Sequence, residues 1–168
     1  MTLLFAQPYD GSASDFFFDT IEQYGERAAK AVNSFGERVE EFEIQFIEGE
    51  RIDAAFAKAV GLNQANVGTF LELVEDWDED DKRRFIVAVE ECGYSFDLHR
   101  DAIGDLDVDL YEGMTLRDLA EEFVDEGLFG DIPEHLRFYI DYDAIARDLA
   151  MDYVETEIAG TRLVYRCA

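Results

Sequence analysis

A chain of 168 residues suits one domain or two to three very small packed units, and its 48% hydrophobic and 14% aromatic content excludes a disordered acidic tail. Forty acidic against 14 basic residues give a net charge of −26, which repels nucleic acid and anionic membranes and favours partners with basic surfaces. The start has no basic region before an apolar one, and no apolar run nears the roughly 20 residues of a membrane helix, so we expect a cytoplasmic protein.

The first sixty residues predict a small α+β unit. Its predicted elements are strands at residues 3–6, 16–18 and 40–47 and a helix at residues 20–32. The third strand alternates polar and apolar side chains, which is the period of a strand. We expect Phe42, Ile44 and Phe46 to face the core of this unit.

The middle of the chain is predicted to be helical. Asn63 can cap one helix, and Asp78 can cap the next, which ends at Gly93. Between the two helices, residues 75–81 read EDWDEDD and hold six acids in seven positions. The helix dipole favours acids at an N-terminus, but this accounts for two or three of them. The remaining acids call for another explanation.

Strict alternation of acidic and apolar residues predicts a strand at residues 105–112. Asp105, Asp107 and Asp109 would form a row on its outer side. Thr115 can cap a following helix that ends near Gly127 and carries acids on its outer face. A hairpin is expected at the end, with strands at residues 153–158 and 162–166 and a turn at residues 159–160.

The acids are patterned along the chain. Residues 69–149 hold 25 acids and 7 bases, a net charge of −18, while residues 51–68 have a net charge of +1 and residues 150–168 of −1. The acidity of a halophilic protein would be more uniform, although the presence of only three lysines keeps halophily open as an alternative. The pattern therefore indicates a function for the acids.

The motifs of enzymes and metal sites are incomplete. No phosphate-binding glycine loop, nucleophile elbow or HEXXH motif occurs. Asp105, Asp107 and Asp109 resemble the start of an EF-hand loop, but Leu110 stands where glycine is needed. Cys92 and Cys167 lack zinc-ligand spacing. We therefore expect no enzyme, no catalytic residue, no metal site and no cofactor.

Patterned acid on a folded core can imitate the charge of DNA. Duplex DNA carries one charge per ~1.7 Å, so 26 net charges correspond to about 44 Å, or roughly 13 base pairs. Acids at alternate positions of a single strand are spaced ~6.6 Å apart, which is a lower charge density than that of duplex DNA. Several elements must therefore present acids side by side. The residues predicted to form this acidic surface are Glu72, Glu75, Asp76, Asp78, Glu79, Asp80, Asp81, Asp105, Asp107, Asp109, Glu112, Asp118, Glu121, Glu122, Asp125 and Glu126.

Residues 130–149 read GDIPEHLRFYIDYDAIARDL and resemble the C-terminal block of ArdA-type antirestriction proteins. Tyr111 and residues 119–122 (LAEE) fit the pattern of this family upstream of the block. Residues 40–44 (EEFEI) resemble its Glu-Glu-Trp-x-Ile strand, with phenylalanine in place of tryptophan.

The resemblance implies a non-enzymatic DNA mimic carried by mobile genetic elements. It implies an elongated α+β chain of three small units, with antiparallel strands, short helices and a strongly acidic surface; we place these units at residues 1–61, 62–104 and 105–168. Such proteins dimerise through the last unit and occupy the DNA-binding groove of type I restriction–modification enzymes, chiefly the methyltransferase. This protects incoming DNA without direct binding of nucleic acid.

The aromatic cluster in the 130–149 block suggests where two chains could join, because a dimer interface is poor in charge and rich in aromatic groups. The candidate residues are Phe138, Tyr139, Ile140 and Tyr142. Alternatively, these four side chains fill the local core.

Two other functions stay open at this point. The acids could bind a different basic partner, such as a nucleoid protein, another DNA-targeting defence complex (for example a CRISPR effector) or cations. A pair of carboxylates could also be catalytic, as in a hydrolase, although 40 acids produce such pairs by chance.

Overall fold

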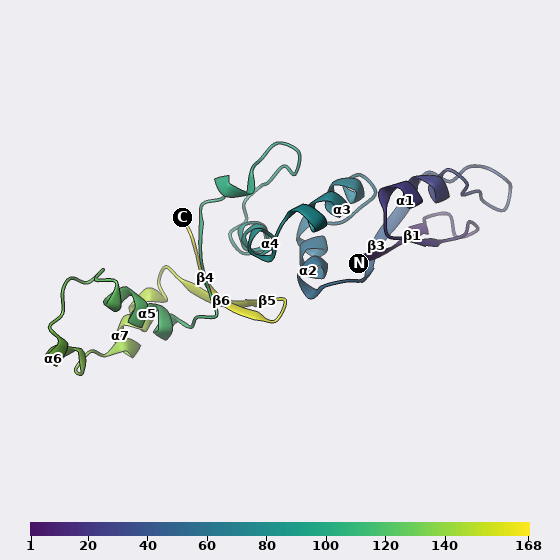
Figure 1. Cartoon of the computed structure of the whole chain (residues 1–168). Helices are drawn as coiled ribbons and strands as arrows, with labels where there is room; N and C mark the ends of the chain where they lie inside the picture. Colours follow the sequence, from purple (N-terminus) through teal and green to yellow (C-terminus); the bar gives the residue numbers. More distant parts are fainter. The chain divides into compact units, whose positions relative to one another are not determined.

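The computed structural model describes residues 1–168, which divide into two compact units, Met1–Ile103 and Gly104–Ala168. Seven α-helices and two three-stranded antiparallel sheets give the predicted α+β class (Figure 1). None of the helices has the length and apolar character needed to cross a membrane. The finer division into units at residues 1–61, 62–104 and 105–168 stays a prediction.

The first unit contains one sheet and four α-helices. In chain order its elements are β1 (Leu3–Pro8), β2 (Phe16–Phe18), α1 (Ile21–Ala28), β3 (Phe42–Glu48), α2 (Arg51–Val60), α3 (Val67–Asp76), α4 (Glu79–Ile86) and the π-helical segment η1 (Val87–Glu91). The three predicted strands are confirmed. The first helix ends earlier than predicted, because Val32 pairs with Arg38 in a β-bridge and so lies outside it.

The first sheet has the strand order β2-β1-β3 and packs one face against α1. Helix α1 begins at Thr20, whose hydroxyl accepts a hydrogen bond from the backbone N–H of Gln23. The ring of Tyr24 on this helix lies 5.0 Å from that of Phe18. The buried sheet residues are Leu4, Ala6, Phe18, Phe42 and Ile44. Phe46, which was also expected in the core, is only half-buried.

An aromatic cluster joins the helices of the first unit. Phe56 of α2 lies with its ring centroid 5.4 Å from that of Phe70 on α3 and 5.3 Å from that of Phe85 on α4. All three side chains are buried. Burial of an aromatic side chain is worth several kcal/mol, so this contact fixes α2, α3 and α4 as one packed body (~3–5 kcal/mol per ring on truncation).

The N-cap of α3 is Asn66, and the prediction of Asn63 is wrong. The side chain of Asn63 accepts a hydrogen bond from the N–H of Ala65 and donates one to the carbonyl of Gly61. Asparagine commonly folds the backbone into a turn in this way, so the helix starts one turn later than the sequence suggested.

The second unit contains the other sheet, of order β4-β6-β5. A 3-10 turn at Ile103–Asp105 is followed by β4 (Val108–Glu112), α5 (Leu116–Asp125), α6 (Glu134–Arg137), α7 (Tyr142–Leu149), β5 (Val154–Ile158) and β6 (Thr161–Cys167). Leu119 and Phe123 of α5 pack on Tyr153 and on Val164 of β6. The predicted helix after Thr115 and the final hairpin are both confirmed.

The turn of the β5–β6 hairpin has two residues with positive φ, Ala159 at 53° and Gly160 at 88°. Two-residue hairpin turns of this hand match the twist of the strands. Gly160 adopts this conformation without a steric penalty, whereas Ala159 adopts it at a cost.

Candidate acidic interface

The sixteen acids predicted to form the charged surface all lie outside the two cores. Twelve are exposed and four are half-buried, the latter being Asp81, Asp109, Glu121 and Glu122. Seven belong to the first unit, at the end of α3 and the start of α4, and nine belong to the second unit, near β4 and along α5. The two sets are described separately below.

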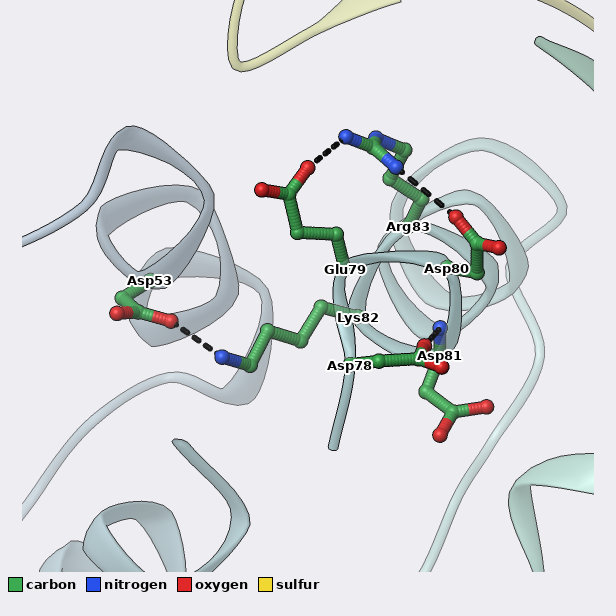
Figure 2. Close-up of polar contacts among 7 residues, drawn as sticks. All are labelled: Asp53, Asp78, Glu79, Asp80, Asp81, Lys82 and Arg83. Carbon is green, nitrogen blue, oxygen red and sulfur yellow. Dashed lines mark hydrogen bonds and ion pairs between the residues drawn. The ribbon is translucent and has the colours of Figure 1, made fainter. Parts of the chain in front are cut away.

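The start of α4 arranges four acids around one helical turn (Figure 2). Asp78 is the N-cap, and its Oδ1 accepts a hydrogen bond of 2.9 Å from the backbone N–H of Asp81, as predicted. Glu79, Asp80 and Asp81 form the first turn, where the helix dipole favours negative charge. Burial, and then the nearby carboxylate of Asp78, raise the pKa of Asp81 above its usual value.

A buried ion pair lies beside this acidic turn. The Nζ of Lys82 is 2.7 Å from Oδ1 of Asp53 on α2, and it also donates a hydrogen bond of 2.8 Å to the carbonyl oxygen of Val74 on α3. Lys82 therefore ties the start of α4 to two other helices. Figure 2 shows its side chain reaching across to Asp53.

The next residue, Arg83, holds two of the acids. One terminal nitrogen of its guanidinium, Nη1, donates to Oδ1 of Asp80 at 3.1 Å, and the other, Nη2, donates to Oε2 of Glu79. The side chain of Arg83 is only 8% exposed, whereas those of Glu79 and Asp80 are 59% and 78% exposed. The cation is thus covered while the two anions face solvent. Figure 2 shows the guanidinium between the two carboxylates.

Trp77 anchors the acid-rich segment to the core of the first unit. Its ring centroid lies 5.3 Å from that of Phe56 and 5.7 Å from that of Phe85. The segment 75–81 is therefore held by an apolar contact at its centre and by helix contacts on either side. Such anchoring keeps mutually repelling carboxylates in place.

The acidic row predicted for one strand is only partly present. Strand β4 begins at Val108, which pairs with Cys167 at the end of β6. Asp105 therefore lies in the preceding 3-10 turn and Asp107 precedes the strand, so the prediction of a three-residue row on a strand is wrong. Asp109 is within β4, and its Oδ2 accepts a hydrogen bond of 2.8 Å from Nε of Arg166 on β6.

The outer face of α5 carries acids that differ in their local partners. Asp118 forms a capping box with Thr115, whose backbone N–H and hydroxyl both donate to Oδ2 at 2.8 Å. These hydrogen bonds lower the pKa of Asp118. Glu121 pairs with Arg117 at 3.3 Å and Asp125 with Arg137 at 2.6 Å.

The four residues predicted at a dimer interface differ in exposure. Phe138 is 95% exposed and Tyr139 is also exposed, with the two rings 6.5 Å apart, whereas Ile140 and Tyr142 are half-buried. Phe138 and Tyr139 follow the short helix α6 and do not fill the local core.

The site also contains functional residues that sequence reasoning missed. From the local sequence, Lys82 and Arg83 contribute only charge, and Asp53 has no evident role. A sequence signal for Arg83 exists, because it follows Glu79 and Asp80 by four and three positions, the spacing at which helical side chains meet. The partner of Lys82 lies 29 positions away, so local spacing cannot reveal it.

The two histidines and the acids form no metal centre. No group of three or more His, Cys, Asp and Glu side chains is arranged to hold a metal ion. His99 and His135 are both exposed. What the acidic residues offer chemically is a set of fixed anions on folded elements.

Comparison with known proteins identifies the family. The family model described as antirestriction protein (ArdA) matches residues 17–161, which include both acidic sets and the 130–149 block. No curated protein matches the chain. Since the match extends over well more than half of the sequence, this chain belongs to the ArdA family of antirestriction proteins.

Proposed function

We propose that this protein is a DNA mimic that occupies the DNA-binding groove of type I restriction–modification enzymes, chiefly the methyltransferase, and so protects incoming mobile DNA. It acts as a stoichiometric inhibitor in the cytoplasm and not as an enzyme. It needs no cofactor and does not bind nucleic acid directly.

The observation that carries this proposal is the placement of the predicted acids within a chain of an antirestriction family. None of the sixteen is buried, although the protein pays for their mutual repulsion in stability. Several are fixed by caps or ion pairs, as at Asp78, Asp118 and Glu79. Fixed anions suit a groove that normally binds phosphates, because backbone-phosphate contacts supply much of the affinity for DNA.

The amount of charge supports a dimeric inhibitor. One chain carries the charge of roughly 13 base pairs of duplex, so two chains would offer about 26. We propose that the dimer forms through the second unit, with Phe138, Tyr139, Ile140 and Tyr142 at the interface. Two exposed aromatic rings in a chain of this charge are the support for that assignment.

The proposal is tested by competition. Purified protein should displace a labelled duplex from a purified type I methyltransferase, and more effectively at low salt, because the interaction is electrostatic. An uncharged protein of similar size is the control for non-specific loss of signal. Absence of competition with several type I enzymes would exclude this target, and capture of a nucleoid protein or another defence complex instead would favour the alternative partner.

A further inference from the structure

We infer that Arg83 is a positioning residue of the acidic surface: a buried cation that fixes the carboxylates of Glu79 and Asp80 where the target enzyme meets them. The inference rests on the proposed function and adds a role for a basic residue within it. Considered by its charge alone, an arginine at this place would weaken a mimic of DNA.

The geometry separates the cation from solvent and leaves the anions accessible. The guanidinium uses one terminal nitrogen for each carboxylate, and each carboxylate uses one oxygen, Oε2 of Glu79 and Oδ1 of Asp80. The second oxygen of each carboxylate is left for an outside donor. An approaching lysine or arginine of the target therefore meets two anions before it meets the covered cation.

The physical benefit is preorganisation. An exposed glutamate samples several rotamers, and fixing such a long side chain on binding costs conformational entropy. The ion pairs with Arg83 fix Glu79 and Asp80 before the partner arrives. A planar guanidinium can hold two carboxylates at once, which a lysine ammonium does with less directional control.

A purely structural role makes a different prediction. Ion pairs at these helical spacings stabilise a helix only slightly. If Arg83 served only the helix, its loss would leave a folded protein more negative by one charge, and long-range attraction to a basic groove would increase. The two roles therefore predict opposite signs for the change in affinity.

The experiment measures competition against duplex DNA for a type I methyltransferase that the wild-type protein inhibits. Arg83→Gln should weaken competition roughly three- to tenfold, reflecting the lost order of Glu79 and Asp80. Arg100→Gln is the matched control, because Arg100 is exposed, belongs to the same unit and makes only a 3.6 Å pair with Asp97. That control makes the same change in charge and should leave competition unchanged or slightly stronger.

A second pair of variants isolates the mechanism. In a Glu79→Gln/Asp80→Asn background, the carboxylates are gone, so replacement of Arg83 should weaken competition less than it does in the wild-type background. Arg83→Lys keeps the charge and serves in both backgrounds if Arg83→Gln does not fold, as checked by circular dichroism. It should cost more affinity in the wild-type background than in the other.

The outcomes distinguish this inference from the proposed function. If the wild-type protein does not compete with DNA, the proposed function fails. If it competes but Arg83→Gln behaves like Arg100→Gln, or if Arg83→Lys is equally costly in both backgrounds, the positioning role is wrong while the proposed function stands.

Discussion

The ammonium of Lys82 lies 2.7 Å from the carboxylate of Asp53, and both side chains are buried between α4 and α2. Lys82 directly follows a segment with six acids in seven residues. The ammonium of Lys82, neutralised by Asp53, is therefore buried next to a segment whose carboxylates repel one another. The segment is thereby joined to the core of the first unit by a polar contact as well as by Trp77.

Loss of one partner of this pair should be strongly destabilising. Asp53→Leu or Lys82→Met leaves the other charge buried and uncompensated, so each should lower the free energy of unfolding by about 3–5 kcal/mol in denaturant titrations. The double variant should recover much of that loss. Lys58→Met is the control, since Lys58 is exposed and its 3.3 Å pair with Glu90 should contribute less than about 0.5 kcal/mol. A double variant as unstable as both single ones combined would contradict this account.

Neutralising acids should weaken inhibition according to where they lie. Glu72, Glu75 and Asp76 are exposed and share one face of α3, by their helical spacing. Their joint replacement by Gln, Gln and Asn should weaken competition with DNA roughly tenfold at low salt, with a flatter salt dependence. Each single replacement should have a small effect, because no one acid is catalytic.

The control for that experiment removes the same charge elsewhere in the first unit. Glu26, Glu41 and Glu43 are exposed and outside the predicted surface. Their joint replacement by Gln should weaken competition much less. Equal loss in the two triple variants would mean that only net charge matters, and complete loss from one single replacement would favour a catalytic acid.

The capping box of α5 should make a pH-dependent contribution to stability. The hydrogen bonds from Thr115 hold the pKa of Asp118 below its ordinary value of 3.8, so the ionised form is favoured in the folded protein. The contribution is therefore present above that ordinary pKa and is lost as the pH falls through the lower, folded value.

The free energy of unfolding of the wild-type protein and of Asp118→Asn should be measured from about pH 7 to about pH 3. The difference between the two proteins should become smaller as the pH falls. Asp152→Asn, a change at another exposed acid of the second unit, should show no such trend. Thr115→Ala removes the cap itself and should cost about 1 kcal/mol at neutral pH. A difference that stayed constant with pH would contradict the role of the Asp118 carboxylate.

The hairpin turn offers a stabilising substitution. Ala159 has a φ of 53°, a conformation that asparagine adopts more readily than alanine, and asparagine followed by glycine is the preferred sequence of this turn. Ala159→Asn should raise the free energy of unfolding of the second unit by roughly 0.5–1 kcal/mol. Ala159→Val, with a branched side chain, should lower it; a neutral result for both would show that the turn is not strained.

The exposed aromatic pair should control association. Phe138→Ser/Tyr139→Ser should convert a dimer into a monomer in sedimentation experiments. Stability of the monomer should change by less than about 0.5 kcal/mol, because neither ring belongs to the core. Phe35→Ser removes an equally conspicuous exposed ring from the first unit and should leave the dimer intact. A dimer that survives loss of Phe138 and Tyr139 would place the interface elsewhere.

By itself, the sequence determined the features that depend on local order. Alternation placed β3, capping residues placed the starts of α4 and α5, and the turn at residues 159–160 placed the final hairpin. Composition determined that the acids outnumber what helix caps need, and the 130–149 block indicated the family that the comparison then identified. These features can be predicted from the sequence because backbone periodicity and side-chain capping act over a few residues.

Only the tertiary structure decided which charges are covered and which face solvent. The pairing of Lys82 with Asp53 joins residues 29 positions apart, and the side chain of Arg83 is only 8% exposed. The pairing of β4 with β6 starts at Val108, so Asp105 and Asp107 lie outside the strand. Burial and strand pairing depend on contacts between distant segments. Local spacing can therefore pair Arg83 with Glu79 and Asp80, but it cannot show that the arginine is covered while the two acids are exposed.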